Sequence, residues 1–549
     1  MQVKPLLSSI QSATFLQDYL KAHGINHVEK FLYPQKTDFD GPFDYPHMND
    51  GIQCFNKHII NNNTIGILVD PDCDGQLSAA ILVDFLYSNF KILPIIFIHK
   101  GKAHGLHPNE DENLLEKIID SHIQLLCIPD AGSNDDSDCT VLKNHGIDIL
   151  ILDHHEIIVK NSNAIVINHH LNSKLNQHLS GTGVVHKFIQ AYCQYYNIEQ
   201  SPFKYMDMVA VSLISDSCQL NILENRSYIY YGLSHLQNKM LILMQQELNR
   251  KGNTPEGWSW GGIPYINSLC RSDQNLDKLV FFSSLAGLKS DNDGLKIIKQ
   301  AHNQQVKIST SLLDEIISTI DFNKKVLIGF SNDQFKSYSG LIANKIMSKY
   351  HKPVLILRQK NEDTYSGSVR SPIPLATKIN NSQLAICTGH EQACGIEIHT
   401  TNLSKLIDWF EQLNLDTQSI IPVTACIVPE QISNELCSIC EKYKNMWGHG
   451  LTEPIFYFKF PVFKLSEFSI FQKRTNTFKI NKKGINFIKF FVPKNEINQI
   501  NLLPDNFEIE LIGKLSINKW NNIITPQCEI IDYEIHDTIS SKNNWEDIF

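Results

Sequence analysis

Acidic and histidine side chains stand at four points of the sequence, each directly after an apolar segment. In chain order they are Asp70, Asp72, Asp74, Asp130, Asp153, His154, His155 and Asp216. Carboxylates that lie close together repel and raise one another's pKa, and a divalent cation removes this repulsion. Carboxylates with one or two imidazoles and no thiolate suit Mn²⁺ or Mg²⁺. Two such ions could clamp the attacking and leaving oxygens of a phosphoryl displacement.

Each of these clusters, taken alone, also has an ordinary structural explanation. An Asp-Gly pair such as Asp74-Gly75 is often only a turn. A pair of histidines is more often on the surface or in the core than on a metal. The occurrence of such clusters after several successive apolar segments favours a functional site over isolated turns. His169 and His170 follow a similar apolar segment without a preceding Asp, which leaves them as a loop or a secondary substrate contact.

The apolar segments predict the elements that would position these side chains. Their near-continuous apolar character is typical of strands buried on both faces. They are residues 64–70, 91–98, 123–130, 147–153 and 164–168. Helical patterns lie between them, so the fold class is α/β with a doubly wound parallel sheet. The carboxyl ends of parallel strands form one edge, where the clusters would converge.

The rest of the chain changes character several times. Residues 200–320 are mostly helical in pattern, a second, smaller α/β pattern follows, and the last hundred residues, rich in Phe, Ile and Lys, predict an all-β barrel. The predicted units are an N-terminal helical segment at 1–50, a catalytic domain at 51–240, a helical linker at 241–322, a substrate-binding domain at 323–430 and a single-strand-binding barrel at 431–549.

Composition narrows the class of protein. The 549 residues are 42% apolar and 19% charged, with a net charge of −9, which excludes a globally basic nucleic-acid binder. No apolar run approaches the roughly 18–20 residues needed to cross a bilayer, and no signal peptide is recognised. The 13 cysteines are scattered through apolar segments. They predict reduced thiols in a cytoplasmic protein with no membrane partner.

The motifs DPDCDG, DAG and DHH, in this order, resemble the DHH phosphoesterase superfamily. From about residue 24 to the end, the chain is similar to its RecJ branch, the family of single-strand-specific 5′→3′ exonucleases. The resemblance implies metal ligands at Asp70, Asp72, Asp74, Asp130, His154 and Asp216, with Asp130 bridging two ions. It implies that His155 contacts the scissile phosphate, that Asp153 orients the histidines, and that Ser78 and Gly183 belong to substrate-binding motifs.

The resemblance extends to the second α/β region. Arg370 and Ser371 in GSVRS, and Gly389 and His390 in GHEQACG, match the substrate motifs of the DHH-associated domain. An arginine can bind a phosphate through its planar fork. Two departures weaken the match. The arginine motif of the family, PRxNAxGR, is read at 281–291 without its arginines, with Lys289 as a partial substitute. A glycine-rich aromatic segment is altered to Ala103-His-Gly-Leu106.

The barrel region carries a local positive charge. Between residues 455 and 500 there are nine Lys or Arg and two Glu, interleaved with aromatic residues. Single-strand binders combine a positive groove with aromatic platforms, although most of these phenylalanines would fill a barrel core. The expected nucleic-acid contacts are Lys473, Arg474, Lys482 and Lys483.

Together these features predict a monomeric exonuclease of single-stranded DNA that uses two Mn²⁺ or Mg²⁺ ions and releases mononucleotides in DNA repair or recombination. A single-strand-binding protein or a helicase is a candidate partner. One alternative is a related phosphodiesterase that cuts short oligonucleotides or cyclic dinucleotides, which would not need a barrel. The other is a DNA-binding scaffold without catalysis, which would not need a complete ligand set.

Overall fold

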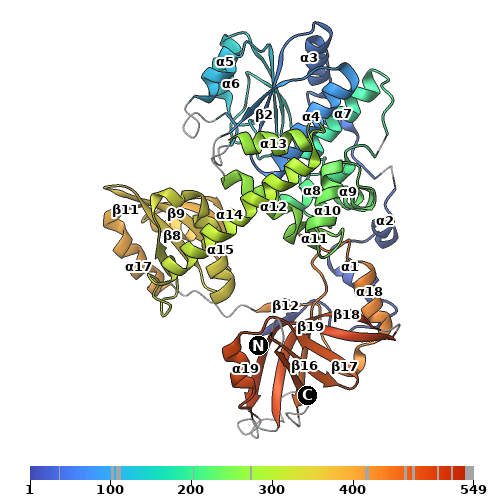
Figure 1. Cartoon of the computed structure of the whole chain (residues 1–549), viewed down its shortest axis with the longest axis vertical. Coiled ribbons are helices and arrows are strands. Elements are labelled where there is room, and N and C mark those ends of the chain that lie inside the picture. Colours follow the sequence, from blue (N-terminus) through green and yellow to red (C-terminus); the bar gives the residue numbers. More distant parts are fainter. Residues whose placement is uncertain are drawn as a thin grey trace.

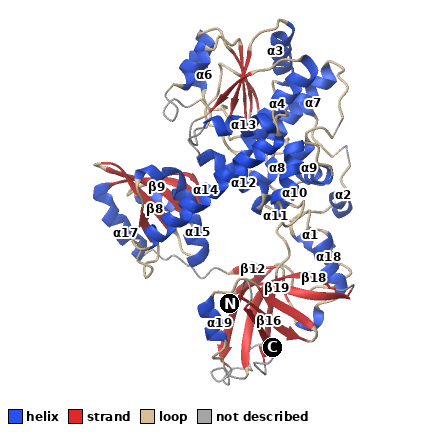
Figure 2. Cartoon of the chain, viewed as in Figure 1, coloured by secondary structure: helices blue, strands red, loops and turns tan. Residues whose placement is uncertain are grey.

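The computed structural model describes residues 1–35, 38–99, 104–106, 113–201, 203–271, 275–413, 420–462, 467–472, 476–503, 506–520 and 523–537. Three sheet-containing units are arranged around a helical region (Figures 1 and 2). Two units are α/β and the third is β-rich, so the predicted fold class is confirmed. Within the described residues, no helix combines the length and apolar character required to cross a bilayer.

The first unit contains a parallel sheet with the strand order β3-β2-β4-β5-β6. Its strands are β2 (Ile65–Val69), β3 (Ile95–Ile98), β4 (Leu125–Pro129), β5 (Asp148–Leu152) and β6 (Ile165–Ile167). Alternate residues of β2 enter different cores, since Ile67 and Leu68 belong to separate buried clusters. The sheet is therefore covered on both faces, as the continuous apolar runs predicted.

Helices cover the two faces of this sheet. The core that includes Ile67 also contains residues of α3 (Met48–Ile60), α4 (Cys73–Phe90) and α7 (Gly181–Tyr195). The core that includes Leu68 contains residues of α5 (Leu114–Asp120) and α6 (Asp136–Asn144). This arrangement is the predicted doubly wound sheet, and it leaves the carboxyl edge of the strands for the site.

The helical region runs from α8 to α14. Its helices are α8 (Met206–Ser215), α9 (Leu223–Ser234), α10 (Lys239–Leu248), α11 (Pro255–Trp260), α12 (Gly262–Ser268), α13 (Asn275–Leu285) and α14 (Asp291–Ile317). The break between α11 and α12 falls at Gly261, where an added Cβ would lie 2.2 Å from the side chain of Asn249. The long helix α14 leads from the first unit to the second (Figure 1).

The second unit is built on a mixed sheet with the order β10-β11-β9-β8-β7. Its strands are β7 (Leu327–Phe330), β8 (Val354–Asn361), β9 (Thr364–Arg370), β10 (Ile386–His390) and β11 (Ala393–His399). Only the β7–β8 pair is parallel among the described pairs of this sheet. The helices α15 (Ser339–Tyr350), α16 (Ala376–Ser382) and α17 (Leu403–Gln412) accompany it.

The third unit contains a sheet with the order β13-β14-β18-β19-β17-β16-β15. Its elements are β13 (Ala425–Cys426), α18 (Asn434–Lys442), β14 (Phe456–Val462), β15 (Phe468–Gln472), β16 (Asn476–Lys482), β17 (Ile485–Lys489), α19 (Lys494–Ile500), β18 (Phe507–Trp520) and β19 (Ile523–Asp537). The aromatic residues Phe478 and Phe487 are fully buried in it. They fill the core of the barrel, which is the structural role expected from the sequence for most of the phenylalanines in this region.

The start of the chain packs on this C-terminal unit. Strand β1 (Val3–Pro5) pairs in parallel with β12 (Ile421–Val423). Residues of α1 (Phe15–Ala22) and α2 (Val28–Leu32) enter the same buried cluster as the barrel strands. The first 32 residues and the barrel therefore share one hydrophobic core.

Candidate metal centre

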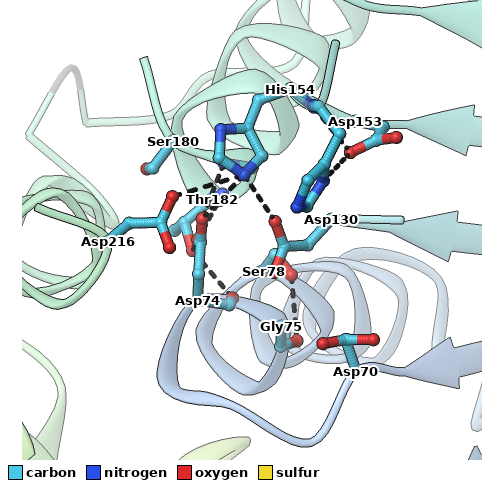
Figure 3. Close-up of polar contacts among 12 residues, drawn as sticks. Asp70, Asp74, Gly75, Ser78, Asp130, Asp153, His154, Ser180, Thr182 and Asp216 are labelled. Carbon is cyan, nitrogen blue, oxygen red and sulfur yellow. Dashed lines mark hydrogen bonds and ion pairs between the residues drawn. The ribbon is translucent and has the colours of Figure 1, made fainter. Parts of the chain in front are cut away.

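The predicted acidic and histidine side chains meet at the carboxyl edge of the parallel sheet (Figure 3). Strand pairing places Pro129 of β4 opposite Leu152 of β5, so the residues that follow these strands leave the sheet side by side. Asp70 follows β2 in the same way. Asp216 arrives from another direction, as the C-cap of α8.

The loop after β2 is tightly constrained. Asp72 is the N-cap of α4, and its Oδ1 accepts a hydrogen bond from the Gly75 amide at 2.9 Å. A Cβ on Gly75 would lie 2.3 Å from the Cβ of Asp70, so this close approach requires glycine. Burial and the charges of Asp70 and Asp74 raise the pKa of Asp72 to about 7. The loop thus holds carboxylates that repel one another in the absence of a cation.

Asp74 is fixed by the N-terminus of α7. Its carboxylate accepts hydrogen bonds from the Gly181 and Thr182 amides, both at 2.8 Å. The hydroxyls of Thr182 and Ser212 also donate to it, at 2.5 and 2.6 Å. Four donors thus surround this carboxylate at the N-terminus of a helix, and together they hold it in one orientation. The glycine motif that begins α7 therefore serves the metal centre by positioning Asp74.

Asp130 is buried at the centre of the cluster. Its φ angle is +66°, in the left-handed region that Asp tolerates better than most residues. Its Oδ1 lies 3.2 Å from His154 Nε2 and receives no hydrogen bond from the described residues. Burial and the charges of Asp74 and Asp72 raise its pKa well above the ordinary value. A Cβ on Gly181 would lie 2.3 Å from this oxygen, so the space beside it also depends on glycine.

The two neighbouring histidines have different surroundings. His154 Nε2 lies 3.2, 3.4 and 3.8 Å from carboxylate oxygens of Asp130, Asp216 and Asp74 (Figure 3). His155 instead contacts Asp153 Oδ1 through Nδ1 at 2.8 Å, and its side chain is 43% exposed. His155 therefore turns its Nε2 away from Asp153 and can reach a substrate, whereas His154 belongs to the carboxylate cluster.

Asp153 is the buried anchor of both histidines. Its Oδ1 also accepts hydrogen bonds from the His154 and His155 amides, at 2.7 and 3.2 Å, and its Oδ2 accepts from the Ser133 amide at 3.1 Å. Burial opposes its ionisation, but the hydrogen bond and positive charge of His155 outweigh burial and hold the pKa of Asp153 below its ordinary value. This contact supports the predicted orienting role.

One neighbour of the cluster was missed as a site residue. His104 Nδ1 lies 2.9 Å from Asp70 Oδ1, and the His104 ring is 4.6 Å from the ring of His155. Burial lowers the pKa of His104, but the charge and hydrogen bond of Asp70, together with the charges of Asp153 and Asp72, raise it to about 9. The altered segment around His104 therefore brings a cation to the rim of the cluster. Ala103, predicted in the same segment, lies outside the described residues.

Two predicted substrate residues of the first unit face inward. Ser78 is fully buried, and its hydroxyl donates to the Gly75 carbonyl oxygen at 2.9 Å. The amide of Gly183 donates to Ser180 Oγ at 3.3 Å, and a Cβ there would meet the side chain of Leu179 at 2.5 Å. In this structure both residues shape the loops around the carboxylates.

The predicted substrate residues of the second unit lie at one end of its sheet. Arg370 ends β9 opposite Ala393, and Gly389 and His390 end β10. Gly389 has a φ of +124°, which favours glycine. Ser371 is buried, and its hydroxyl donates to the Ile373 carbonyl oxygen at 2.7 Å. The strand ends thus bring together the two motifs that were predicted separately.

A second segment matches the spacing of the arginine motif better than residues 281–291 do. Residues 264–271, PYINSLCR, carry Pro, Asn and Arg at the spacing of PRxNAxGR, with Tyr265 in place of the first arginine. Asn267 Oδ1 accepts from the Cys73 amide, and Cys270 Sγ donates to the Pro71 carbonyl oxygen, both at 3.0 Å. This segment therefore packs against the loop that carries the predicted ligands Asp72 and Asp74.

Residues 281–291, by contrast, lie elsewhere. A cavity of about 390 Å³ is lined by Ala286, Gly287 and Lys289, and also by Asp84 of α4. Arg271, in the segment 264–271, instead contacts α14, where its guanidinium donates to Gln305 Oε1 at 3.1 Å. Its charge adds to burial in lowering the pKa of Arg370. The spacing of Pro264, Asn267 and Arg271 was the signal that could have identified this residue.

The basic residues of the barrel are only partly available. Lys473 and Arg474 lie outside the described residues. Lys482 pairs with Glu467 at 2.9 Å, and Lys483 lies 3.7 Å from Glu430. Phe471 is 47% exposed, with Lys479 5.9 Å from the centre of its ring. The surface around Phe471 and Lys479 thus combines charge with an exposed aromatic ring.

The metal-free cluster should make folding stability depend on pH. Asp72, Asp130 and Asp216 all have raised pKa values, mainly because of burial. An acid whose pKa is higher in the folded state binds more protons when folded, so stability is lost as pH rises. We expect the unfolding temperature in chelator to fall between about pH 4 and pH 7, and Mn²⁺ to raise it more at pH 7 than at pH 5. Equal unfolding temperatures across this range in chelator would contradict the carboxylate cluster.

Comparisons with known proteins agree with this geometry. Residues 64–213 match the DHH family, N-terminal domain, and residues 424–532 match the RecJ OB domain. YorK of Bacillus subtilis strain 168, named as an SPbeta prophage-derived single-strand DNA-specific exonuclease, is 27% identical over 95% of this chain and 96% of its own. The single-stranded-DNA-specific exonuclease RecJ of Bacillus subtilis strain 168 is 22% identical over 100% of this chain and 72% of its own.

A solved structure has the same fold over nearly the whole chain. RecJ from Thermus thermophilus in complex with Mn²⁺ superimposes with a TM-score of 0.75 at 17% identity, covering 97% of this chain and 78% of its own. The same protein in complex with Mg²⁺ gives a TM-score of 0.70 at 16% identity, covering 97% of this chain and 77% of its own. The site at the edge of the parallel sheet and the C-terminal barrel thus lie in the two segments that match the DHH family, N-terminal domain, and the RecJ OB domain.

Proposed function

We propose that this chain is a metal-dependent exonuclease that hydrolyses single-stranded DNA from an end, in the 5′→3′ direction, and releases mononucleotides in DNA repair or recombination. The observation that carries this proposal is the convergence of carboxylates and an imidazole on the DHH sheet in a chain that also has an OB domain. The naming of its full-length relatives as single-strand DNA-specific exonucleases supports the substrate.

The side chains around the site fit two divalent ions. One group of mutually close ligand atoms comes from Asp70, Asp72 and Asp130, and another from Asp74, His154 and Asp216. Asp130 also approaches His154, so it is placed between the two groups. A bound cation would satisfy the buried Asp130 oxygen, which receives no hydrogen bond from the described residues, and would offset the repulsion that raises the pKa of Asp130. Oxygen-rich ligands favour Mn²⁺ or Mg²⁺.

Side chains around the site can position the phosphate that the ions would activate. When bound, the ions would lower the pKa of water and stabilise charge on the phosphate oxygens. Asp153 holds the His155 ring through Nδ1, which leaves Nε2 to donate a hydrogen bond to a phosphate oxygen. Arg271 and Arg370, from the helical region and the second unit, can bind a flanking phosphate through their planar forks. The site would thus be assembled between two units.

A phosphodiesterase acting on short oligonucleotides or cyclic dinucleotides is the competing activity within the superfamily. The barrel argues against it, because a dinucleotide cannot reach from the metal centre to a separate nucleic-acid-binding unit. Turnover of dinucleotides that exceeded turnover of long single strands would favour the competing activity.

The proposal is tested with a single-stranded oligonucleotide labelled at either end, with Mn²⁺ or with chelator. We expect prompt release of the 5′ label as a mononucleotide in Mn²⁺, no release in chelator, and no digestion of a blunt duplex. Prompt release of the 3′ label would support exonucleolytic hydrolysis but would refute the proposed 5′→3′ direction. Bound but intact DNA in Mn²⁺ would refute the enzyme and leave a binding scaffold.

A further inference from the structure

An exposed tryptophan stands between the metal centre and the barrel. Trp260 ends α11 with 75% of its surface exposed, and it is the most exposed Trp among the described side chains. The indole is the largest side chain available for stacking, and its exposure to water is unfavourable unless something covers it. Figure 1 shows α11 at the edge of the helical region that faces the barrel.

Trp260 lines a cavity of about 300 Å³ that joins three parts of the molecule. Ser217 and Cys218, which directly follow the predicted ligand Asp216, form its wall near the metal centre. Lys514 of β18 forms its wall on the barrel. The cavity therefore lies between residues next to the predicted ligand Asp216 and a strand of the barrel, where a single strand passing from the metal centre to the barrel could cross it.

The floor of this cavity is apolar and rigid. Leu213, Leu220 and Trp447 line it, and each is less than 5% exposed. The Trp447 indole donates to the Cys440 carbonyl oxygen at 3.5 Å, so its ring is held in place. Serine, threonine and histidine side chains at the wall, among them Ser217 and His449, could hydrogen-bond the edge of a base. This combination suits a flat, partly polar ring.

The charges of the cavity favour a base over a phosphate. Its cation, Lys514, lies 2.5 Å from Glu453 and 3.7 Å from Glu256. Glu453 thus pairs with the group that would otherwise attract a phosphate, while Glu256 is shared with Lys251 at 2.6 Å. An uncharged aromatic ring does not depend on a free cation.

We infer that this cavity binds one nucleobase of the single strand, several nucleotides behind the end under hydrolysis, with Trp260 as its stacking platform. The inference rests on the proposed function and adds to it a base-binding subsite between the catalytic unit and the barrel. Stacking accepts any base, so the subsite grips the strand without selecting a sequence.

The test moves a single abasic site along an otherwise uniform oligonucleotide and measures binding by fluorescence anisotropy. The Asp130→Asn background with Mn²⁺ keeps the strand intact. We expect one internal position at which the missing base weakens binding roughly 5- to 150-fold, the factor for one stacked base. Trp260→Ala should weaken binding of the intact strand by a similar factor and remove the dependence at that position.

Two further variants separate stacking from general damage. Trp260→Phe keeps an aromatic ring and should retain the position-dependent profile. Tyr87→Ala removes another exposed aromatic side chain, on α4 and outside the cavity, and should bind like the background protein. The same abasic profile in Trp260→Ala as in the background would overturn the subsite while leaving the proposed function intact. Failure of the background protein to bind single strands at all would overturn both.

Discussion

Replacement of Asp130 by asparagine is expected to lower kcat for single-strand hydrolysis by about 10³-fold, which corresponds to roughly 4 kcal/mol of transition-state stabilisation. Asp130 approaches both groups of ligand atoms, so its charge is needed by both predicted ions. Asparagine keeps the shape of the side chain and tolerates the φ of +66°, so the backbone should not be strained. The measurement is a steady-state assay on a labelled oligonucleotide across a Mn²⁺ titration.

The same variant should be more stable than the wild-type protein without metal. The raised pKa of Asp130 shows that its ionised form is disfavoured by burial and by Asp74 and Asp72. Removing this charge relieves repulsion in chelator, so the unfolding temperature should rise at pH 7 while activity is lost. Asp120→Asn, at the exposed end of α5, is the matched control and should change neither property. Activity above a few percent of wild type in Asp130→Asn would refute the bridging role.

Much of the predicted metal centre could be inferred from the sequence, because the residues that follow parallel strands all lie at the carboxyl edge of the sheet. Asp70, Asp130 and Asp153 follow strands whose apolar runs are unmistakable, and the structure brings them together. The inward positions of Ser78 and Gly183 could not be predicted in this way. Motif membership indicates that a residue is needed near a site, but it does not distinguish a substrate contact from a contact that shapes the loop.

The residues that were missed depend on tertiary contacts. Arg271 lies in a helical segment whose sequence carries no strand-end signal, and the substitution at Tyr265 hid the motif spacing. His104 reaches Asp70 from a loop, across 34 positions of sequence. The packing of Phe15 and Tyr19 against the barrel joins residues more than 400 positions apart. Periodicity within a segment reports that a face is buried, but not which distant element covers it.

Replacing His154 and His155 by alanine, one at a time, should impair the activity in different ways. His154 Nε2 faces three carboxylates in the ligand cluster, so its loss should raise the Mn²⁺ concentration for half-maximal activity by at least about tenfold. His155 is held by Asp153 through Nδ1, and one of its ring nitrogens lies within 4.8 Å of ligand atoms of Asp130 and His154 without contacting Asp74 or Asp216 in an ion pair among the described residues. Its loss should lower kcat by about 10²- to 10³-fold, the effect of one removed oxyanion donor, with little change in the Mn²⁺ requirement.

The distinction can be measured by titrating Mn²⁺ at saturating oligonucleotide for both variants. His145→Ala, which removes an exposed imidazole at the C-terminal end of α6, is the matched control and should behave like the wild type. Asp153→Asn should reproduce the kcat loss of His155→Ala, because asparagine is a weaker acceptor for the Nδ1 proton and no longer fixes the ring. A shared loss of Mn²⁺ affinity in His154→Ala and His155→Ala would mean that both rings bind metal. In that case the phosphate contact would have to come from another cation at the rim, and the charge and position of His104 make it the first to test.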